Sequence, residues 1–184
     1  MGKLSDDFKL EKYGLHVRLV NEDDAAFIVE LRTDYKLGKY INATENNIEK
    51  QKEWIREYKK REKEGRDYYF IFFSDGKFCG VNRIYNITID SFTTGSWVFS
   101  SEAPIGSSIL ANIITREIAY KLFSCKKHLF DVKRANTNVN RYHATFKSTL
   151  LYQDELTNYY ICSEENFEKY KNIHLRMFAQ KIEI

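Results

Sequence analysis

The fold of this chain is decided around one loop-like stretch, Ser100-Ser101-Glu102-Ala103-Pro104-Ile105-Gly106-Ser107-Ser108. Residues 93–99, upstream of it, are rich in β-branched and aromatic side chains, which favour a strand. Downstream, in residues 107–124, apolar side chains recur at the spacing of a helix face. The sequence therefore predicts a strand, a tight loop and a helix in this order.

The loop contains the residue types that an anion-binding turn uses. Gly106 stands two residues after the only proline of the chain, and Ser107 and Ser108 fall where the helix begins. Such a loop can turn several backbone N–H groups toward one point, and the helix N-terminus adds partial positive charge. An anion such as pyrophosphate is the ligand that this pattern predicts. Plain helix capping is the alternative interpretation, since serine accepts from free N–H groups and glycine relieves the turn.

The composition is that of one ordinary globular domain spanning residues 1–184. Hydrophobic residues make up 43% of the chain and charged residues 30%, and no apolar run reaches the length of a membrane span. The N-terminus has no apolar stretch resembling a secretory signal and the three cysteines are scattered, so we expect a cytoplasmic protein. A net charge of +3 with mixed signs predicts no nucleic-acid partner, and no His, Cys or carboxylate spacing predicts a metal site.

Strand and helix patterns follow one another along the chain. We expect strands at residues 15–20, 68–73, 78–87, 93–99, 129–133, 149–152 and 158–161. We expect helices at residues 21–32, 47–63, 107–124 and 137–147. Asn21 is placed to cap the first helix, and the charge run at residues 59–64 is expected to be the solvated end of the second. Asp75-Gly76 predicts a hairpin turn, and the whole order predicts a mixed α+β fold.

This order of elements and three local matches resemble the GNAT superfamily of acetyl-CoA-dependent N-acetyltransferases over residues 15–161. Residues 95–99, Gly-Ser-Trp-Val-Phe, are similar to the central strand that pairs with the pantetheine arm in that family. Residues 103–108 lie where the family has its pyrophosphate loop, and residues 130–143 resemble the strand and helix beside the thioester sulfur. The resemblance implies the GNAT fold, a mixed central sheet of about seven strands flanked by helices, in a single acetyltransferase domain.

By this resemblance acetyl-CoA is the cosubstrate and no metal takes part. The residues that the resemblance assigns to acetyl-CoA binding are Trp97, Val98, Phe99, Ala103, Ile105, Gly106, Ser107, Ser108, Asn136 and Val139. A backbone N–H near Trp97 to Phe99 is expected to hold the oxyanion of the reaction. The family's usual Gln or Arg is replaced by Ala103 and its second small residue by Ser108, so the loop is expected to act through its backbone. Asn136 is also placed as a helix N-cap, and the two roles are compatible.

His143 stands where the family has a tyrosine that gives a proton to the departing thiolate. Because histidine titrates near neutrality, His143 can serve as that catalytic acid. It also shares the apolar face of its helix with Val139, Tyr142 and Phe146, where a hydrogen-bonded core histidine would have no catalytic function. Both interpretations stay open at the level of the sequence. The family helix usually ends in Gly-Phe, which is Lys147-Ser148 here.

Within the superfamily the chain resembles the branch with ribosomal-protein N-terminal acetyltransferases and the amino-sugar acetyltransferases of bacterial surface-polysaccharide synthesis. The segments 31–34, 52–55 and 158–161 favour a nucleotide-linked amino sugar as the acceptor. A protein N-terminus and a GNAT module that binds acyl-CoA without turnover are the alternatives. The expected partner is thus a small-molecule amine, with no membrane partner, and an oligomer is left open.

The acceptor pocket is expected between the first two helices, their connection at residues 34–46 and the antiparallel meander of the strands at residues 68–73, 78–87 and 93–99. Tyr35, Tyr40, Arg83 and Tyr85 are candidate contacts of the acceptor, although packing is the favoured interpretation for each tyrosine. Glu102 lies beside the cofactor loop and is a candidate general base, with a chain of water molecules as the alternative.

Overall fold

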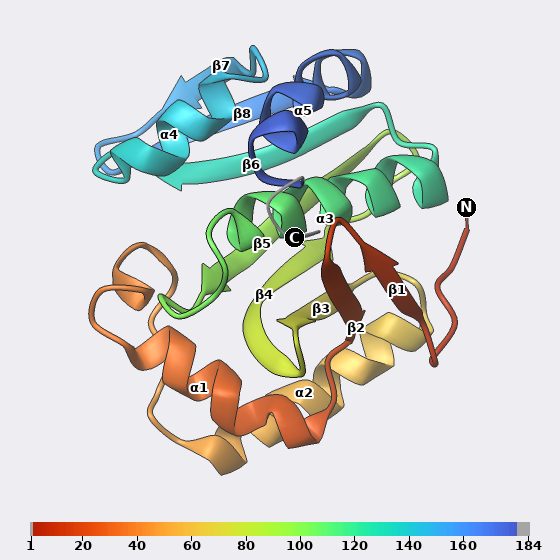
Figure 1. Cartoon of the computed structure of the whole chain (residues 1–184), viewed down its shortest axis with the longest axis vertical. Helices are drawn as coiled ribbons and strands as arrows, with labels where there is room; N and C mark the ends of the chain where they lie inside the picture. The colour runs from red at the N-terminus through yellow and green to blue at the C-terminus, as the bar shows by residue number, and fades with distance from the viewer. Residues whose placement is uncertain (1, 180–184) are drawn as a thin grey trace.

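An eight-stranded sheet runs through the protein in the order β1-β2-β3-β4-β5-β6-β8-β7 (Figure 1). The computed structural model describes residues 2–179. The strands are β1 (Lys9–Lys12), β2 (Leu15–Leu19), β3 (Tyr68–Ser74), β4 (Lys77–Tyr85), β5 (Ser91–Phe99), β6 (Lys127–Lys133), β7 (Thr149–Gln153) and β8 (Thr157–Ser163). The helices are α1 (Ala25–Thr33), α2 (Ile48–Lys63), α3 (Ser107–Phe123), α4 (Thr137–Ala144) and α5 (Glu164–Phe178), with short 3-10 turns η1 (Glu22–Asp24) and η2 (Gly38–Tyr40).

Helices cover both faces of the sheet and divide its core into two clusters. Helices α1 and α2 pack on one face, where residues such as Ile28 and Ile55 meet Ile71 of β3. On the other face, α3 crosses the sheet, and α5 packs against α3 (Figure 1). Strand β3 serves both clusters, since Tyr68, Phe70 and Phe72 face α3 while Tyr69 and Ile71 face α1 and α2. The unbroken apolar run at residues 68–72 therefore follows from burial on both faces.

The sheet opens between its two parallel neighbours, β5 and β6. These strands pair only where Ser91–Thr93 meet Lys127–Leu129, and beyond that point β5 and β6 diverge. All other neighbouring pairs of the sheet are antiparallel. Thr94–Phe99 of β5 thus has β4 on one side and an open edge on the other. This gap is the feature of the fold that positions the site described below.

Several local predictions are confirmed by the structure. Asn21 caps η1 in a capping box, and its side chain accepts from Asp23 N–H. Asn136 caps α4 through its side-chain oxygen, and Asn47, where the second helix was expected to begin, is the N-cap of α2. Asp75 and Gly76 take the left-handed conformation of a tight hairpin turn, with φ of 49° and 73°.

The sequence interpretation missed two elements, and its sheet was one strand short. β1 is a short edge strand of alternating half-buried and exposed residues, which gives it little hydrophobic signal. α5 follows residue 161, where the recognised pattern ends; Ser163 caps it and Glu164 and Glu165 occupy its first turn. The charge run at the end of α2 is also not wholly solvated, because Glu62 is buried between Lys59 and the hydroxyl of Tyr58.

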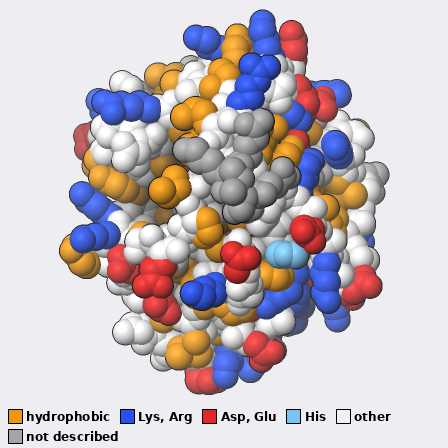
Figure 2. All heavy atoms as spheres, viewed as in Figure 1, with side chains coloured by type: hydrophobic (Ala, Val, Ile, Leu, Met, Phe, Trp, Pro, Cys, Tyr) orange, Lys and Arg blue, Asp and Glu red, His pale blue; other side chains and the backbone are white. Residues whose placement is uncertain are grey.

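The exterior is mixed in charge. On the face seen in Figure 2, basic and acidic side chains are interspersed and form no patch of one sign. Among residues 2–179, no helix combines the length and the apolar character needed to cross a membrane.

Candidate active site

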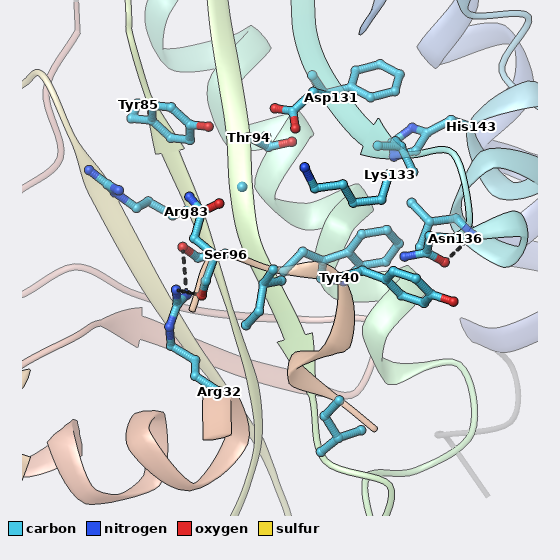
Figure 3. A pocket seen from close by; sticks show the side chains of 18 residues that line it. Arg32, Tyr40, Arg83, Tyr85, Thr94, Ser96, Asp131, Lys133, Asn136 and His143 are labelled. Atoms are coloured by element: carbon cyan, nitrogen blue, oxygen red, sulfur yellow. Dashed lines mark hydrogen bonds between the residues drawn. The ribbon is translucent and has the colours of Figure 1, made fainter. Parts of the chain in front are cut away.

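A cavity of about 330 Å³ lies where β5 and β6 part. Its walls come from Thr94–Trp97 of β5, Phe130–Lys133 of β6 and one face of α4. Arg32 from the end of α1 and Tyr40 from η2 close it on the α1 side (Figure 3). The cavity thus joins segments that are about a hundred residues apart in sequence.

A β-bulge shapes the β5 wall of this cavity. Gly95 pairs with Arg83 and Val98 pairs with Val81, so Ser96 and Trp97 share the single position opposite Asn82. Ser96 has a positive φ of 50°, which is the backbone distortion that the bulge requires. The bulge interrupts the ladder at the point where β5 borders the cavity.

Beyond the bulge, β5 presents unpaired backbone groups to the gap. Ser100 N–H donates to Cys79 O of β4 at 2.8 Å. Because successive N–H groups of a strand point to opposite edges, the N–H of Phe99 points to the open edge. A linear amide-bearing ligand can pair with such an edge.

His143 lies in the wall that α4 contributes (Figure 3). Its ring stacks on Phe130 with centroids 3.9 Å apart and meets Trp97 edge-on at 6.1 Å. The side chain is 3% exposed, Nδ1 is buried without a partner, and neither ring nitrogen forms a hydrogen bond within residues 2–179. A core histidine held by a hydrogen bond therefore does not describe this residue. An unpartnered buried nitrogen beside a cavity is instead what a ligand contact explains.

The environment of His143 sets its protonation state. Burial, and secondarily the positive charge of Arg116, lower the pKa of His143 well below the ordinary value of 6.5. The imidazole is therefore neutral at pH 7. A neutral ring can donate an N–H hydrogen bond to a developing anion, whereas it is a weak acid for full proton transfer.

Asn136, Val139 and Trp97 line the same cavity as His143, as the sequence interpretation grouped them. Trp97 Nε1 donates to Ser108 O at 3.0 Å, which ties the end of β5 to the start of α3. Lys147 takes a left-handed conformation with φ of 52° at the position of the missing glycine. Val98 and Phe99 are placed differently, because their side chains are buried in the two cores, and only their backbone borders the gap.

The loop at residues 103–108 stands outside this cavity, at the N-terminus of α3. Within residues 2–179, backbone N–H groups of Gly106 and Ser108 have no backbone acceptor, and Ser107 Oγ is buried without a partner. Ala103 is half-buried, whereas Ile105 is 81% exposed. The arrangement provides free donors at the positive end of a 17-residue helix.

Gly106 has a packing function in addition to its place in this loop. Its φ is +90°, and a Cβ there would overlap Cδ1 of Phe178 in α5. A substitution at Gly106 therefore disturbs the contact between α3 and α5 as well as the loop.

The sequence interpretation gave no role to Asp131, a charged residue that lines the cavity. Asp131 and Lys133 both project from β6 toward the gap (Figure 3), and Asp131 is the only carboxylate among the cavity-lining residues that the structure describes. Strand alternation could have suggested them, because Phe130 and Val132 are buried on the opposite face. Glu102 is exposed in the turn after β5 and does not line the cavity.

Of the four candidate acceptor contacts, three line the cavity and one does not. Tyr40, Arg83 and Tyr85 line the cavity, whereas Tyr35 is 78% exposed and lies outside it. No cluster of three His, Cys, Asp or Glu side chains suited to a metal ion occurs within residues 2–179.

Solved structures of known proteins resemble this fold over nearly its full length. No protein-family model and no curated protein sequence matches the chain. The structure of apo FdhC, a nucleotide-linked sugar GNAT, is 30% identical, with a TM-score of 0.83, and the match covers 94% of this chain and 99% of FdhC.

Two structures at lower identity share the fold. Ribosomal-protein-S5-alanine acetyltransferase from Vibrio fischeri is 15% identical with a TM-score of 0.73, covering 88% of this chain and 99% of its own. RimJ from Mycobacterium smegmatis, in complex with CoA-disulfide, is 17% identical with a TM-score of 0.71, and the match covers 89% of this chain and 88% of RimJ. With the parted strands, the bulge and the full-length match to FdhC, the chain belongs to the GNAT superfamily and is an N-acetyltransferase.

Proposed function

We propose that this protein transfers the acetyl group of acetyl-CoA to the primary amine of a nucleotide-linked amino sugar, as a single domain over residues 1–184. The cavity between β5 and β6 carries this proposal, because it borders the open edge of β5 and contains both anionic and cationic side chains. The sugar acceptor is supported by the 30% identity to FdhC, compared with 15% and 17% for the two ribosomal-protein acetyltransferase relatives.

In this proposal the chain binds acetyl-CoA along one continuous path. Free N–H groups at residues 103–108 receive the pyrophosphate, with Ser107 and Ser108 beginning the helix. The backbone of Trp97, Val98 and Phe99 pairs with the pantetheine arm. Asn136 and Val139 then bound the end of the path next to His143.

The transfer step uses groups that line the cavity. Asp131 accepts the proton of the acceptor ammonium, and the neutral amine attacks the thioester carbonyl. A backbone N–H at the β5 bulge donates to the oxyanion, an interaction typically worth about 2.7 to 4 kcal/mol of barrier. The C–S bond then breaks while the neutral His143 donates an N–H hydrogen bond to the departing thiolate, and this thiolate takes up the second proton of the acceptor nitrogen.

Acceptor preference tests the proposal directly. We expect CoA release, followed with a thiol reagent, to show a kcat/KM at least about tenfold higher for a UDP- or dTDP-linked amino sugar than for a ribosomal-protein N-terminal peptide, since one extra charged contact is typically worth that factor. Acetyl-CoA should also raise Tm in the absence of acceptor, by mass action.

The reverse acceptor preference would make the protein an N-terminal acetyltransferase. A Tm shift with no thiol release for any amine would make it a binding module.

His143→Phe should separate the catalytic from the packing interpretation of His143. Phenylalanine preserves the stacking on Phe130 and removes a nitrogen that has no protein partner, so stability should be kept. Loss of the hydrogen bond to the thiolate should lower kcat by about 10². The measurement is kcat, the acetyl-CoA affinity and Tm on one sample; a normal kcat would exclude the catalytic role.

A further inference from the structure

A second cavity of about 390 Å³ adjoins the first on the α1 and α2 side of the sheet. Arg32, Arg83, Asn42 and Ser96 line both cavities, so the two meet at the β5 bulge. The second cavity takes its other walls from residues 43–51, Trp54 of α2 and Tyr69 of β3. No residue of the loop at 103–108 or of α4 lines it, so it lies apart from the proposed acetyl-CoA path.

Arg32 at the junction is a cation without an anionic partner. Its Nε donates to Thr44 Oγ1 at 2.5 Å, Nη1 to Ser96 Oγ at 3.3 Å and Nη2 to Asn42 O at 3.0 Å. These acceptors are all neutral, and within residues 2–179 no carboxylate forms a salt bridge with Arg32. A guanidinium has five N–H donors, so two remain for a ligand.

The other cations of this cavity are already balanced. Arg83 donates Nε to Oδ1 of Asp67 at 2.7 Å and Nη2 to Oδ2 of the same buried carboxylate. Lys50 donates to Glu45 at the exposed rim. The unbalanced positive charge of the second cavity is therefore that of Arg32.

Tyr69, whose hydroxyl lies beside Arg32 and Ser96, adds a second observation. Its side chain is 2% exposed, lines the second cavity, and its hydroxyl has no hydrogen-bond partner within residues 2–179. Burial raises the pKa of Tyr69, so the phenol is protonated and can donate. A buried hydroxyl facing a cavity without a partner is explained when a ligand oxygen accepts from it.

We infer that Arg32 and Tyr69 bind a phosphate group of the acceptor's nucleoside diphosphate, with the amino sugar reaching past Ser96 into the first cavity. The planar guanidinium matches phosphate in geometry and charge, and a neutral hydroxyl adds a donor without repelling the anion. This inference rests on the proposed function, because it assigns the acceptor's phosphates to the second cavity and leaves those of CoA at the 103–108 loop.

The experiment measures UDP and dTDP binding by calorimetry with CoA present at saturation, so that the CoA phosphate site is occupied. The variants are Arg32→Gln and Tyr69→Phe, with Arg56→Gln as the matched control, because Arg56 pairs with Glu22 and lines neither cavity. The wild type should bind a nucleoside diphosphate but not the nucleoside. Arg32→Gln should weaken that binding about 10- to 100-fold, the range of hydrogen bonds to charged groups, and Arg56→Gln should leave it unchanged.

Tyr69→Phe provides a second test of the phosphate site in case Arg32→Gln does not fold. It removes a hydroxyl that lies beside Arg32 and Ser96 without a hydrogen bond of normal geometry to either, so Tm without ligand should be kept while nucleotide binding weakens about 3- to 10-fold. In turnover, both variants should raise KM for the nucleotide-linked amino sugar and leave KM for acetyl-CoA unchanged.

The outcomes separate this inference from the proposed function. Turnover of nucleotide-linked amino sugars with an unchanged KM in Arg32→Gln and Tyr69→Phe would overturn the phosphate site alone. Wild-type turnover only of acceptors without phosphate, with no binding of UDP or dTDP, would overturn both.

Discussion

Asp131→Asn should lower kcat by about 10² to 10⁴ at pH 7, the usual contribution of a positioned general base. The acceptor amine is an ammonium at this pH and must lose a proton before it can attack. Asp131 is the carboxylate that faces the gap between β5 and β6, and asparagine has its shape without its basicity. Affinity for acetyl-CoA should not change, because Asp131 lies outside the expected cofactor path.

The pH profile of the same variant distinguishes a base from a residue that only maintains structure. As the pH approaches 9, the free acceptor amine deprotonates in solution, so the kcat/KM of Asp131→Asn should recover toward that of the wild type. Asp90→Asn is the matched control, because Asp90 pairs with Lys127 where β5 and β6 are still joined. A wild-type kcat with an unaltered pH profile in Asp131→Asn would refute the assignment.

Unfolding should become markedly easier between pH 6.5 and pH 5.5. Burial, together with the charge of Arg116, lowers the pKa of His128 and of His143 well below 6.5, and the pKa of His174 is lowered for the same reasons. Arg116 is itself fully buried between the rings of Phe146 and Phe167. The folded protein thus holds these imidazoles neutral at a pH where an unfolded chain would protonate them.

The sign of the effect follows from proton uptake. Below pH 6.5 the unfolded state binds more protons than the folded state, so the free energy of unfolding falls as the pH falls toward the depressed pKa values. For a group that stays neutral when folded, the loss over this window is about 1 kcal/mol. His128 and His143 together should therefore lower Tm by roughly 4 to 8 °C in a chain of this size.

Denaturant titrations at pH 6.5 and 5.5 measure this loss. In His143→Phe this loss should be smaller by about the contribution of one imidazole, because one buried neutral ring is gone. Equal stability at the two pH values would show that the buried rings are not held neutral.

Local sequence determined most of the secondary structure. The strand, loop and helix across residues 91–123, the caps Asn21, Asn47 and Asn136 and the turn at Asp75-Gly76 all depend on neighbours within a few positions. Such short-range preferences can be read without knowledge of the rest of the chain. The resemblance to the superfamily rests on the same local segments, and the full-length match to FdhC confirms it.

The tertiary structure alone decided which of these residues meet. Asp131 looks like an ordinary exposed residue of a strand until β6 diverges from β5 and turns it toward a cavity. Glu62 looks solvated until Tyr58 and Lys59 enclose it, and Gly106 looks like a loop glycine until Phe178 packs against it. Within residues 2–179, Arg32 has no anionic partner, and the Tyr69 hydroxyl and His143 Nδ1 have no hydrogen-bond partner. These features, too, are visible only in the tertiary structure. Hydrogen-bond satisfaction depends on atoms brought together from distant segments, and no periodicity along the chain encodes it.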